Sequence, residues 1–348
     1  MELAVVLVHY HTPGLLRGAI AALERDAAAS DITLEGVVVD NGSAPDDRPL
    51  APAPWRCLEP GENLGYAGGV NLGMAETTAP WAVVMNPDVE VLSGCLAALA
   101  NALDQGAAVA GPRFFWDRGR RFLLPPTERV GRWAELTRTL AEGSEGWARR
   151  ARHAWRRHAR TQWLASEPIP SHDSSGALLA LRRDAWQRIG PFDAGYPLYF
   201  EETDWLQRAR RAGAQGLFVP AAEAIHLYAQ STVKEGQAAQ WFEQSSRRFR
   251  QRTYGKRFTG LLEWLGPRVS RPWTPAVSTG PENPAQPGDW LEVSPSPKGY
   301  PAAGCRLEPG ESPRLPDEII ERLAPGRYFC RRVDRSGREG PLSSLEVL

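Results

Sequence analysis

A short apolar run followed by Asn86-Pro87-Asp88 could provide a cation-binding carboxylate. Residues 81–85 contain no polar side chain, which is typical of a strand buried on both faces of a sheet. Pro87 ends that strand because proline cannot donate the next backbone hydrogen bond. Asp88 would then lie at the carboxyl end of a central strand, where open α/β sheets form their ligand crevice. A carboxylate there suits a divalent cation that holds phosphate oxygens, although Asn-Pro-Asp is also a common strand-ending turn.

A second acidic group stands where a helix is predicted to begin. Glu201, Glu202 and Asp204 follow the aromatic pair at 199–200. Acidic residues in a first helical turn are also favoured by the helix dipole alone. Three acids within four residues, placed after an aromatic run, favour a site that contains a general base. Glu201 and Asp204 would share one helical face, and Glu202 would point about a quarter turn away.

A glycine-rich segment, residues 63–73, precedes the strand that leads to Asp88. Glycines at this density let a backbone approach a ligand and present its N–H groups to phosphate at a helix start, here expected at 70–76. A flexible surface loop is the alternative. Upstream, residues 36–39 predict a strand that ends in Asp40, whose carboxylate could accept hydrogen bonds from a ribose or nucleobase, or form an Asx turn.

Together these motifs resemble family 2 glycosyltransferases, and the nearest branch is the rhamnosyltransferase-like bacterial enzymes. The resemblance rests on Val-Asp-Asn-Gly-Ser at 39–43, Asn-x-Gly-Tyr-Ala-Gly-Gly-x-Asn at 63–71 and Asn-Pro-Asp-Val at 86–89. Ser-Gly-Ala at 175–177 and Gly-x-Phe-Asp at 190–193 extend it. The family implies a GT-A fold, which is a mixed, mostly parallel α/β sheet with helices on both faces. It also implies transfer of a sugar in bacterial cell-surface polysaccharide synthesis.

The resemblance assigns roles around the acceptor. The usual acidic pair of the family is Glu-Asp, whereas this chain has Glu201-Glu202. The second residue of the pair, Glu202, is the expected base, with Glu201 and Asp204 as competing carboxylates. The acceptor side would be formed by Ser175, Gly176 and Trp205. One base and no evident second nucleophile predict a single in-line displacement with inversion at the anomeric carbon.

The resemblance further implies a divalent metal, Mg²⁺ or Mn²⁺, held by Asp88 and His226, with Ser231 and Thr232 nearby. Asn86 occupies the position at which many glycosyltransferases of this fold carry the first aspartate of Asp-x-Asp. The expected donor is a dTDP- or UDP-linked sugar, and the acceptor is a glycan or a lipid-linked molecule. The expected donor-binding residues are Tyr10, Asp40, Asn63, Gly65, Tyr66, Gly69, Asn71, Asn86 and Asp88.

Two other function classes fit part of the pattern. A nucleotidyltransferase would usually show a basic glycine-rich motif after the first strand, where this chain has His-Tyr-His-Thr-Pro at 9–13. A non-catalytic glycan-binding protein would keep the fold but lose the acidic cluster at 201–204. The retained cluster therefore favours glycosyl transfer.

The 348 residues predict one large and one small domain. The glycosyltransferase domain would span 1–265, a proline-rich linker 266–288 and a small β-sandwich-like domain 289–348. An insertion at about 117–167 is rich in tryptophan and arginine. Its apolar residues between 147 and 163 recur every four positions and predict a basic amphipathic helix. That helix could contact a membrane surface or an anionic acceptor, or could pack its tryptophans on the protein.

Composition limits the remaining classes. Acidic and basic residues balance at 41 each, which argues against a nucleic-acid partner. The four cysteines are scattered without a CxxC pair, so a reducing cytoplasm fits better than a disulfide framework. No apolar run approaches the roughly 20 residues that span a bilayer. We therefore expect a cytoplasmic protein, with peripheral contact to the inner membrane face through 147–163 as an option; the sequence also allows an oligomer.

Overall fold

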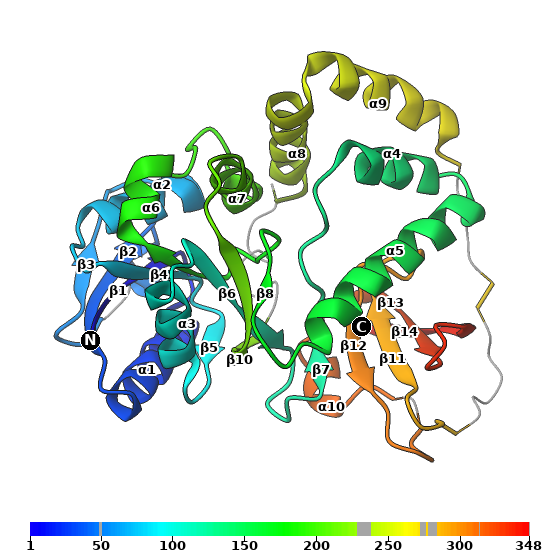
Figure 1. The fold of residues 1–348 in the computed structure, drawn as a ribbon, viewed down its shortest axis with the longest axis horizontal. Helices are drawn as coiled ribbons and strands as arrows, with labels where there is room; N and C mark the ends of the chain where they lie inside the picture. The colour runs from blue at the N-terminus through cyan, green and yellow to red at the C-terminus, as the bar shows by residue number, and fades with distance from the viewer. Residues whose placement is uncertain (49–50, 228–237, 272–275, 278–283, 313, 348) are drawn as a thin grey trace. The chain divides into compact units, whose positions relative to one another are not determined.

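The chain folds into two compact units (Figure 1). The structure is a computed structural model that describes residues 1–48, 51–227, 238–271, 276–277, 284–312 and 314–347. Unit 1 contains Met1–Phe114 and Ala165–Thr253, and unit 2 contains Phe115–Leu164 and Tyr254–Leu348. Ser231 and Thr232 lie outside the described residues. Within the described ranges, no helix is both long enough and apolar enough to cross a bilayer.

Unit 1 is built from a mixed sheet and the helices that follow its strands. Its strands are β1 (Glu2–His9), β2 (Thr33–Asp40), β3 (Arg56–Leu58), β4 (Trp81–Met85), β5 (Val89–Val91), β6 (Val109–Phe115), β8 (Ile169–Pro170), β9 (Leu178–Arg182) and β10 (Gly216–His226). Its helices are α1 (Pro13–Ala29), α2 (Gly65–Ala75), α3 (Cys95–Asp104), α6 (Arg183–Ile189), α7 (Glu201–Arg211) and α8 (Ala238–Tyr254).

The strand order of this sheet is β6-β9-β4-β1-β2-β3. The pairs β2–β3, β1–β2 and β1–β4 are parallel. Strand β9 runs antiparallel to both β4 and β6, and β10 pairs antiparallel with β5 and β8. The predicted mixed α/β class is therefore confirmed, with parallel pairing from β3 to β4.

Helices cover both faces of the unit 1 sheet, as the continuous apolar strands predict. Along β1, Leu3, Val5 and Leu7 pack into one core with α1 and α3. The intervening residues Ala4 and Val6 pack into a second core with α2, α6 and α7. Successive side chains of a strand point to opposite faces, so a strand with two helical layers must be apolar throughout.

Helix α2 begins at Gly65, earlier than the start at residue 70 expected from the sequence. A Cβ atom on Gly69 would lie 2.8 Å from a Val8 methyl, and one on Gly73 would lie 2.3 Å from a Val6 methyl. These two glycines therefore let the helix lie directly on β1. The sequence suggested that glycine at position 69 lets the backbone approach a ligand. In the structure, a side chain at this position would point into the sheet, so packing of α2 on β1 explains the glycine instead.

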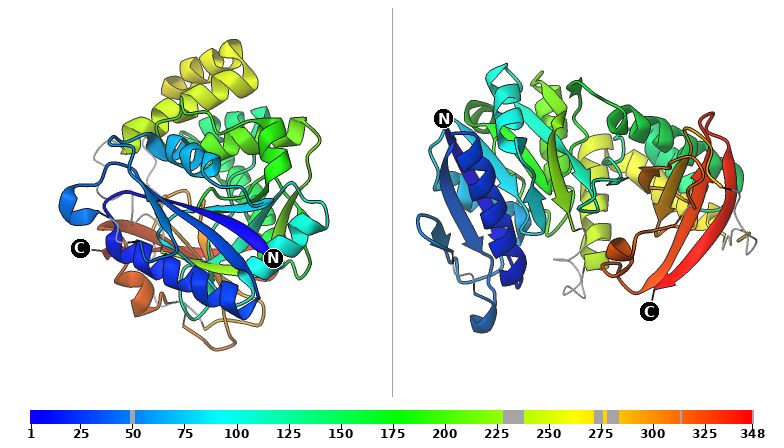
Figure 2. Two further views of the ribbon diagram at one scale, coloured as in Figure 1. Left: turned by 90° about the vertical axis from the view of Figure 1, so that its left-hand side faces the viewer. Right: turned by 90° about the horizontal axis from the view of Figure 1, so that it is seen from below.

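Unit 2 contains one antiparallel sheet with the order β14-β13-β11-β12-β7. Its strands are β7 (Phe122–Leu123), β11 (Trp290–Ser294), β12 (Ala303–Arg306), β13 (Gly326–Val333) and β14 (Glu339–Val347), and its helices are α4 (Arg132–Ala141), α5 (Glu145–Trp163), α9 (Lys256–Val269) and α10 (Asp317–Ile320). The expected β-sandwich would need a second stacked sheet; in the described residues of unit 2, α5 packs on the sheet instead (Figures 1 and 2).

The tryptophan face of α5 is buried against this sheet. Trp163 stacks on Trp290 with ring centroids 5.3 Å apart, and a Cβ on Gly304 would lie 2.3 Å from the Trp163 ring. Arg156 donates two hydrogen bonds to Glu292 at 2.6 and 2.8 Å. Of the alternatives for this helix, the structure shows packing for Trp155 and Trp163. These contacts group the insertion with the C-terminal residues, whereas the sequence interpretation placed it in the domain at 1–265.

Candidate functional site

Two predicted site residues, Asp40 and Asp88, lie at the carboxyl ends of the parallel strands of unit 1. His9 ends β1 and is paired in register with Asp40, the last residue of β2. Asp88 follows β4 after the Asn-Pro turn, and the neighbouring backbone is fixed because the Leu227 N–H donates to the Asp88 carbonyl at 2.9 Å. Parallel strands bring these three ends to one edge of the sheet, as their positions in the sequence predict.

His9 organises the loop after β2, a role that sequence reasoning missed. The Thr12 N–H donates to His9 Nε2 at 3.1 Å, so Nε2 is unprotonated and the ring proton lies on Nδ1. Nδ1 faces Asp40 Oδ1 at 3.3 Å and Ser43 Oγ at 3.2 Å. Burial lowers the pKa of His9, and Asp40 only partly opposes this, so the ring stays neutral. Its position at the end of the first predicted strand was the available signal.

Asn41, also not assigned from the sequence, links this loop to the start of α2. Its Nδ2 donates to Asn63 Oδ1 at 2.9 Å, and its Oδ1 accepts from the Leu64 N–H at 2.8 Å. Gly65 has φ of +70°, which favours glycine, and its N–H donates to Asn63 Oδ1 at 2.8 Å. The expected donor-binding loops around Asp40 and Asn63 are thus joined by side-chain hydrogen bonds. Tyr10 is half-buried, with its ring edge-on to that of His11.

Three predicted carboxylates, Asp88, Glu201 and Glu202, form a carboxylate cluster with Tyr66. The Tyr66 hydroxyl donates to the Gly176 carbonyl at 2.8 Å, and a Cβ on Gly176 would lie 2.9 Å from Glu202 Cγ. Burial and then the charges of Glu201, Glu202 and Asp88 raise the pKa of Tyr66 well above its usual range. Residues far apart in the sequence therefore share one acidic environment.

The two glutamates of this cluster differ in their surroundings. Glu201 is buried, and its Oε2 has no hydrogen-bond partner among the described residues. Burial, and then the neighbouring Glu202, raise the pKa of Glu201 well above its ordinary value. Glu202 is half-buried and accepts a hydrogen bond from the Thr203 hydroxyl at 3.3 Å; burial also raises its pKa. The deeper burial of Glu201 and its unpaired Oε2 therefore disfavour its ionised form more than the half-buried position of Glu202 does.

The loop before α7 holds these glutamates in a strained arrangement. Tyr199 and Phe200 have φ of +66° and +70°, a region that bulky side chains rarely adopt. Helix α8 supports the loop: the Phe249 ring lies 5.4 Å from that of Phe200, and the Ser245 hydroxyl donates to the Leu198 carbonyl at 2.7 Å. Strain of this kind persists only where surrounding packing over-determines it, and it is common at functional sites.

Asp88 and His226 form the candidate metal pair. His226 Nε2 lies 3.4 Å from Asp88 Oδ2, while Asp88 Oδ1 is buried with no hydrogen-bond partner in the described part of the chain. No group of three His, Cys, Asp or Glu side chains suited to a metal occurs among the described residues. The Asp88 carboxylate still fits Mg²⁺ or Mn²⁺, because Mg²⁺ commonly takes one or two carboxylates and fills its other positions with water and substrate phosphate.

Three predicted site residues have structural partners instead. Asp204 is buried, accepts a hydrogen bond from Arg208 Nε at 2.9 Å and lies 3.6 Å from Arg252 Nε, so it is not available as a base in this arrangement. Trp205, expected beside the acceptor, is fully buried and donates to the Gly190 carbonyl at 2.8 Å. Asn71 exchanges two hydrogen bonds with the Phe192 backbone and thereby ties α2 to the loop after α6.

Hydrogen bonds from backbone N–H groups hold Asn86 and Ser175 near the carboxylate cluster. The Asn86 N–H donates to the Ala177 carbonyl at 2.9 Å, which joins the Asn-Pro-Asp turn to the Ser-Gly-Ala segment. Within that segment, the Ser175 hydroxyl accepts from the Ala177 N–H at 3.2 Å and forms a tight turn. The turn places Gly176 against Glu202.

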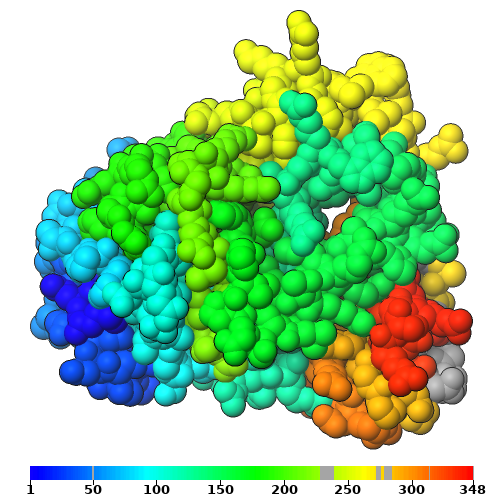
Figure 3. All heavy atoms as spheres, viewed as in Figure 1, coloured from blue at the N-terminus to red at the C-terminus, as the bar shows by residue number. Residues whose placement is uncertain are grey.

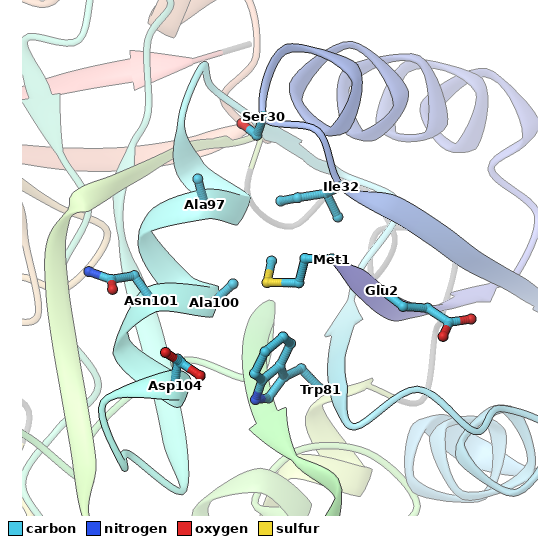
Figure 4. Close-up of a pocket in the computed structure, with 9 residues that line it drawn as sticks. All are labelled: Met1, Glu2, Ser30, Ile32, Trp81, Ala97, Ala100, Asn101 and Asp104. Atoms are coloured by element: carbon cyan, nitrogen blue, oxygen red, sulfur yellow. The ribbon is translucent and has the colours of Figure 1, made fainter.

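A cavity of about 570 Å³ lies at the opposite, amino-terminal edge of the same sheet (Figure 4). Its lining includes Met1, Trp81, Ala97 and Ala100 together with the acidic residues Glu2 and Asp104. None of the predicted site residues lines it. Its walls are mainly apolar, so the carboxylate cluster, and not this cavity, is the candidate site.

Comparison with known proteins decides the family. The sequence model of "Glycosyl transferase family 2" matches residues 4–190, more than half of the chain. The chain belongs to glycosyl transferase family 2. The matched residues contain most of β1, all of β2 and β4, and the Asn-Pro-Asp turn. Family membership makes this protein a glycosyltransferase. It thereby favours glycosyl transfer over the nucleotidyltransferase and glycan-binding alternatives.

Individual relatives of this glycosyltransferase include an N-acetylglucosaminyl-diphospho-decaprenol L-rhamnosyltransferase of Mycobacterium tuberculosis. The two are 30% identical over 254 residues, which cover 67% of this chain and 78% of the relative. An uncharacterized protein of Mycobacterium bovis is 27% identical over 269 residues, covering 73% and 86%. Among solved structures, GalNAc-T7 with UDP, GalNAc and Mn²⁺ is similar with a TM-score of 0.48 at 13% identity, covering 77% of this chain and 55% of that one. TarS of S. aureus has a TM-score of 0.43 at 11% identity, covering 74% of each.

Proposed function

We propose that unit 1 transfers a sugar, with inversion, from a nucleotide-diphosphate-sugar to a hydroxyl group of a glycan or lipid-linked acceptor. The observation that carries this proposal is the cluster of Tyr66, Asp88, Glu201 and Glu202. Asp88 Oδ1 and Glu201 Oε2 are buried there without a hydrogen-bond partner among the described residues. Buried oxygens of this kind are normally paired, so a bound substrate or cation would satisfy both.

Glu202 is the proposed general base. The acceptor O–H proton passes to a Glu202 carboxylate oxygen while the acceptor oxygen bonds to the anomeric carbon. The bond from that carbon to the diphosphate oxygen breaks, and the diphosphate keeps the electron pair. A carboxylate whose pKa is raised toward the working pH is a stronger base once it is ionised. Glu201 is more deeply buried and its pKa is raised by burial, so it is better suited to donate a hydrogen bond to the acceptor than to take its proton.

Asp88 and His226 are the proposed ligands of a divalent cation, and the support is the unpaired buried Oδ1 of Asp88. When bound, Mg²⁺ or Mn²⁺ would neutralise charge that develops on the leaving diphosphate. Two segments, the loop that begins at Asp40 and the segment around Asn63, would hold the nucleotide. The hydrogen bonds His9–Asp40 and Asn41–Asn63 fix these segments before the donor binds.

The name of one relative suggests which classes of donor and acceptor to test first. The mycobacterial relative is named as a rhamnosyltransferase that acts on a diphospho-decaprenol-linked N-acetylglucosamine. On that basis we place a deoxyhexose on dTDP or UDP first among donors, and a polyprenyl-diphosphate-linked saccharide first among acceptors. This chemistry fits a cytoplasmic step of bacterial cell-surface polysaccharide synthesis.

The test is a panel of nucleotide-sugars, measured by donor hydrolysis and by thermal stabilisation with and without Mn²⁺. With the donor so identified, Glu202→Gln should lower kcat by a factor of roughly 100 to 10,000 while donor stabilisation is kept. Asp88→Asn should remove the Mn²⁺-dependent part of donor stabilisation. Because the pKa of Glu202 is raised, wild-type turnover should fall in acid at a pH above 4.5, the ordinary value for glutamate.

Matched variants separate the candidate bases. If Glu201→Gln loses turnover while Glu202→Gln keeps it, the assignment of the base is wrong. Full turnover in excess chelator, or in Asp88→Asn, would refute the metal role without affecting the base. A chain that neither binds nor hydrolyses any sugar nucleotide in the panel would refute the proposed donor class.

A further inference from the structure

Helix α9 of unit 2 presents an exposed stripe that the glycosyl transfer chemistry does not use. Arg257, Leu261, Trp264 and Arg268 are spaced by four, three and four residues and therefore share one face of the helix. The Leu261 side chain is 49% exposed and that of Trp264 is 55% exposed. Two large apolar side chains at consecutive turns therefore lie together on the solvent-facing side of α9.

The opposite face of α9 packs on α4, so the stripe faces away from α4 toward solvent. Thr259 and Leu262 are buried, at 1% and 4% exposure. Near the start of both helices, the Arg132 guanidinium lies 5.6 Å from the centre of the Phe258 ring and also donates to the Tyr254 carbonyl at 3.0 Å. Figures 1 and 2 show α9 alongside α4, and Figure 3 shows atoms of the yellow segment at the molecular surface. Removing the stripe side chains should therefore leave this packing intact.

Charge surrounds the apolar part of the stripe. Arginines stand at both ends of the Leu261–Trp264 pair, and the Arg268 guanidinium lies over the Trp264 ring at 4.3 Å from its centre. Lys256 and the exposed Arg271 add positive charge, against one acidic residue, Glu263, in α9. A tryptophan and a leucine flanked by cations match the layered chemistry of a bilayer surface, where apolar chains lie just below anionic headgroups.

From this combination we infer that α9 docks on an anionic lipid bilayer. A stable protein–protein interface buries about 1,200–2,000 Å² in total, and two apolar side chains on one helix are far from supplying that area. A bilayer needs no such area, because shallow insertion of a few apolar groups adds to the attraction between cations and headgroups. The surface suggested by the sequence, 147–163, is a weaker candidate, since Trp155 and Trp163 are buried within unit 2.

The experiment is sedimentation of the full chain with vesicles made of equal parts phosphatidylglycerol and phosphatidylcholine, and with pure phosphatidylcholine vesicles. We expect binding to the anionic vesicles that weakens with added salt. The double variants Leu261→Ala/Trp264→Ala and Arg257→Glu/Arg268→Glu should each lower the partition coefficient by roughly tenfold or more. Donor hydrolysis in solution should stay unchanged in both, which separates this inference from the proposed function.

Two controls make the result specific. Phe242→Ala removes a similarly exposed aromatic side chain, 51% exposed on α8, and should bind vesicles like wild type. Arg149→Glu/Arg157→Glu reverses two exposed charges of α5 and should affect binding less than the α9 charge reversal. The inference is overturned if wild type ignores anionic vesicles, if the α9 variants bind normally, or if the α5 variant loses more binding than they do.

Discussion

Replacing Glu339 by Gln should destabilise unit 2, because this carboxylate lies among three arginines. Glu339 accepts hydrogen bonds from Arg152 Nε and Arg331 Nη1, each at 2.6 Å, and lies 3.0 Å from Arg156 Nη1. The side chains of Arg152 and Arg156 are only 4% exposed, and that of Glu339 is 15% exposed. The glutamine would leave buried guanidinium groups with one carboxylate, Glu292, in place of two.

The magnitude follows from the pKa of Glu339. Burial alone would raise it, but the hydrogen bond from Arg152 and the charges of Arg152, Arg331 and Arg156 lower it from 4.5 to about 2. A difference of roughly 2.5 pK units corresponds to about 3 kcal/mol at 1.36 kcal/mol per unit. Removing one partner of a buried ion pair costs about 3–5 kcal/mol in other proteins, which is the same order.

The sign of the pH dependence follows from the lowered pKa. A carboxyl group with a folded pKa below its unfolded value contributes its full stability above the unfolded pKa. That contribution is lost as the pH falls through the folded pKa. The free energy of unfolding of wild type should therefore exceed that of Glu339→Gln by about 3 kcal/mol at pH 7, and this gap should close between roughly pH 5 and pH 2.

Urea unfolding of both full chains, followed by tryptophan fluorescence at several pH values, measures this gap. The control is Glu346→Gln in the neighbouring exposed pair, where Arg327 and Glu346 are 3.5 Å apart with side chains 55% and 62% exposed. Its free energy of unfolding should change by less than about 1 kcal/mol. A Glu339→Gln effect no larger than the control, or a gap that does not narrow in acid, would refute the reasoning.

Two further predictions concern glycines. Gly73→Ala should lower the free energy of unfolding by about 1–3 kcal/mol, because its Cβ would lie 2.3 Å from the buried Val6. Gly14→Ala, with open space around the new Cβ, should raise the free energy of unfolding by about 0.5–1 kcal/mol in the same denaturation assay. Equal effects at both positions would contradict the close packing of α2. Gly176→Ala should lower kcat more than it changes donor stabilisation, because its Cβ would lie 2.9 Å from Glu202 Cγ and would push that side chain aside. Unchanged turnover would argue that the Glu202 position is not critical.

Much of unit 1 could be predicted from local sequence. Continuous apolar runs such as residues 3–8 and 81–85 predict strands covered on both faces, and the two cores confirm this. Polar residues after those runs, including Asp40 and Asp88, could be assigned to one edge of the sheet because parallel strands end together. The start of α7 at Glu201 also agrees with the predicted acidic helix start. Each of these inferences depends on neighbouring residues in the chain.

What the local sequence could not determine is which distant group each side chain meets. Asp204 and Glu202 are both acidic residues of one helical turn, but Asp204 is paired with Arg208 and lies near Arg252, while Glu202 lies against Gly176. Gly69 could be read as a phosphate-binding glycine until the packing of α2 on Val8 is known. The regular tryptophans of α5 indicated a buried or membrane-bound face, and only the stacking of Trp163 on Trp290 decided between them. Residue type and spacing determine which face of an element is apolar or charged, whereas the partner of that face depends on tertiary contacts that the local sequence does not specify.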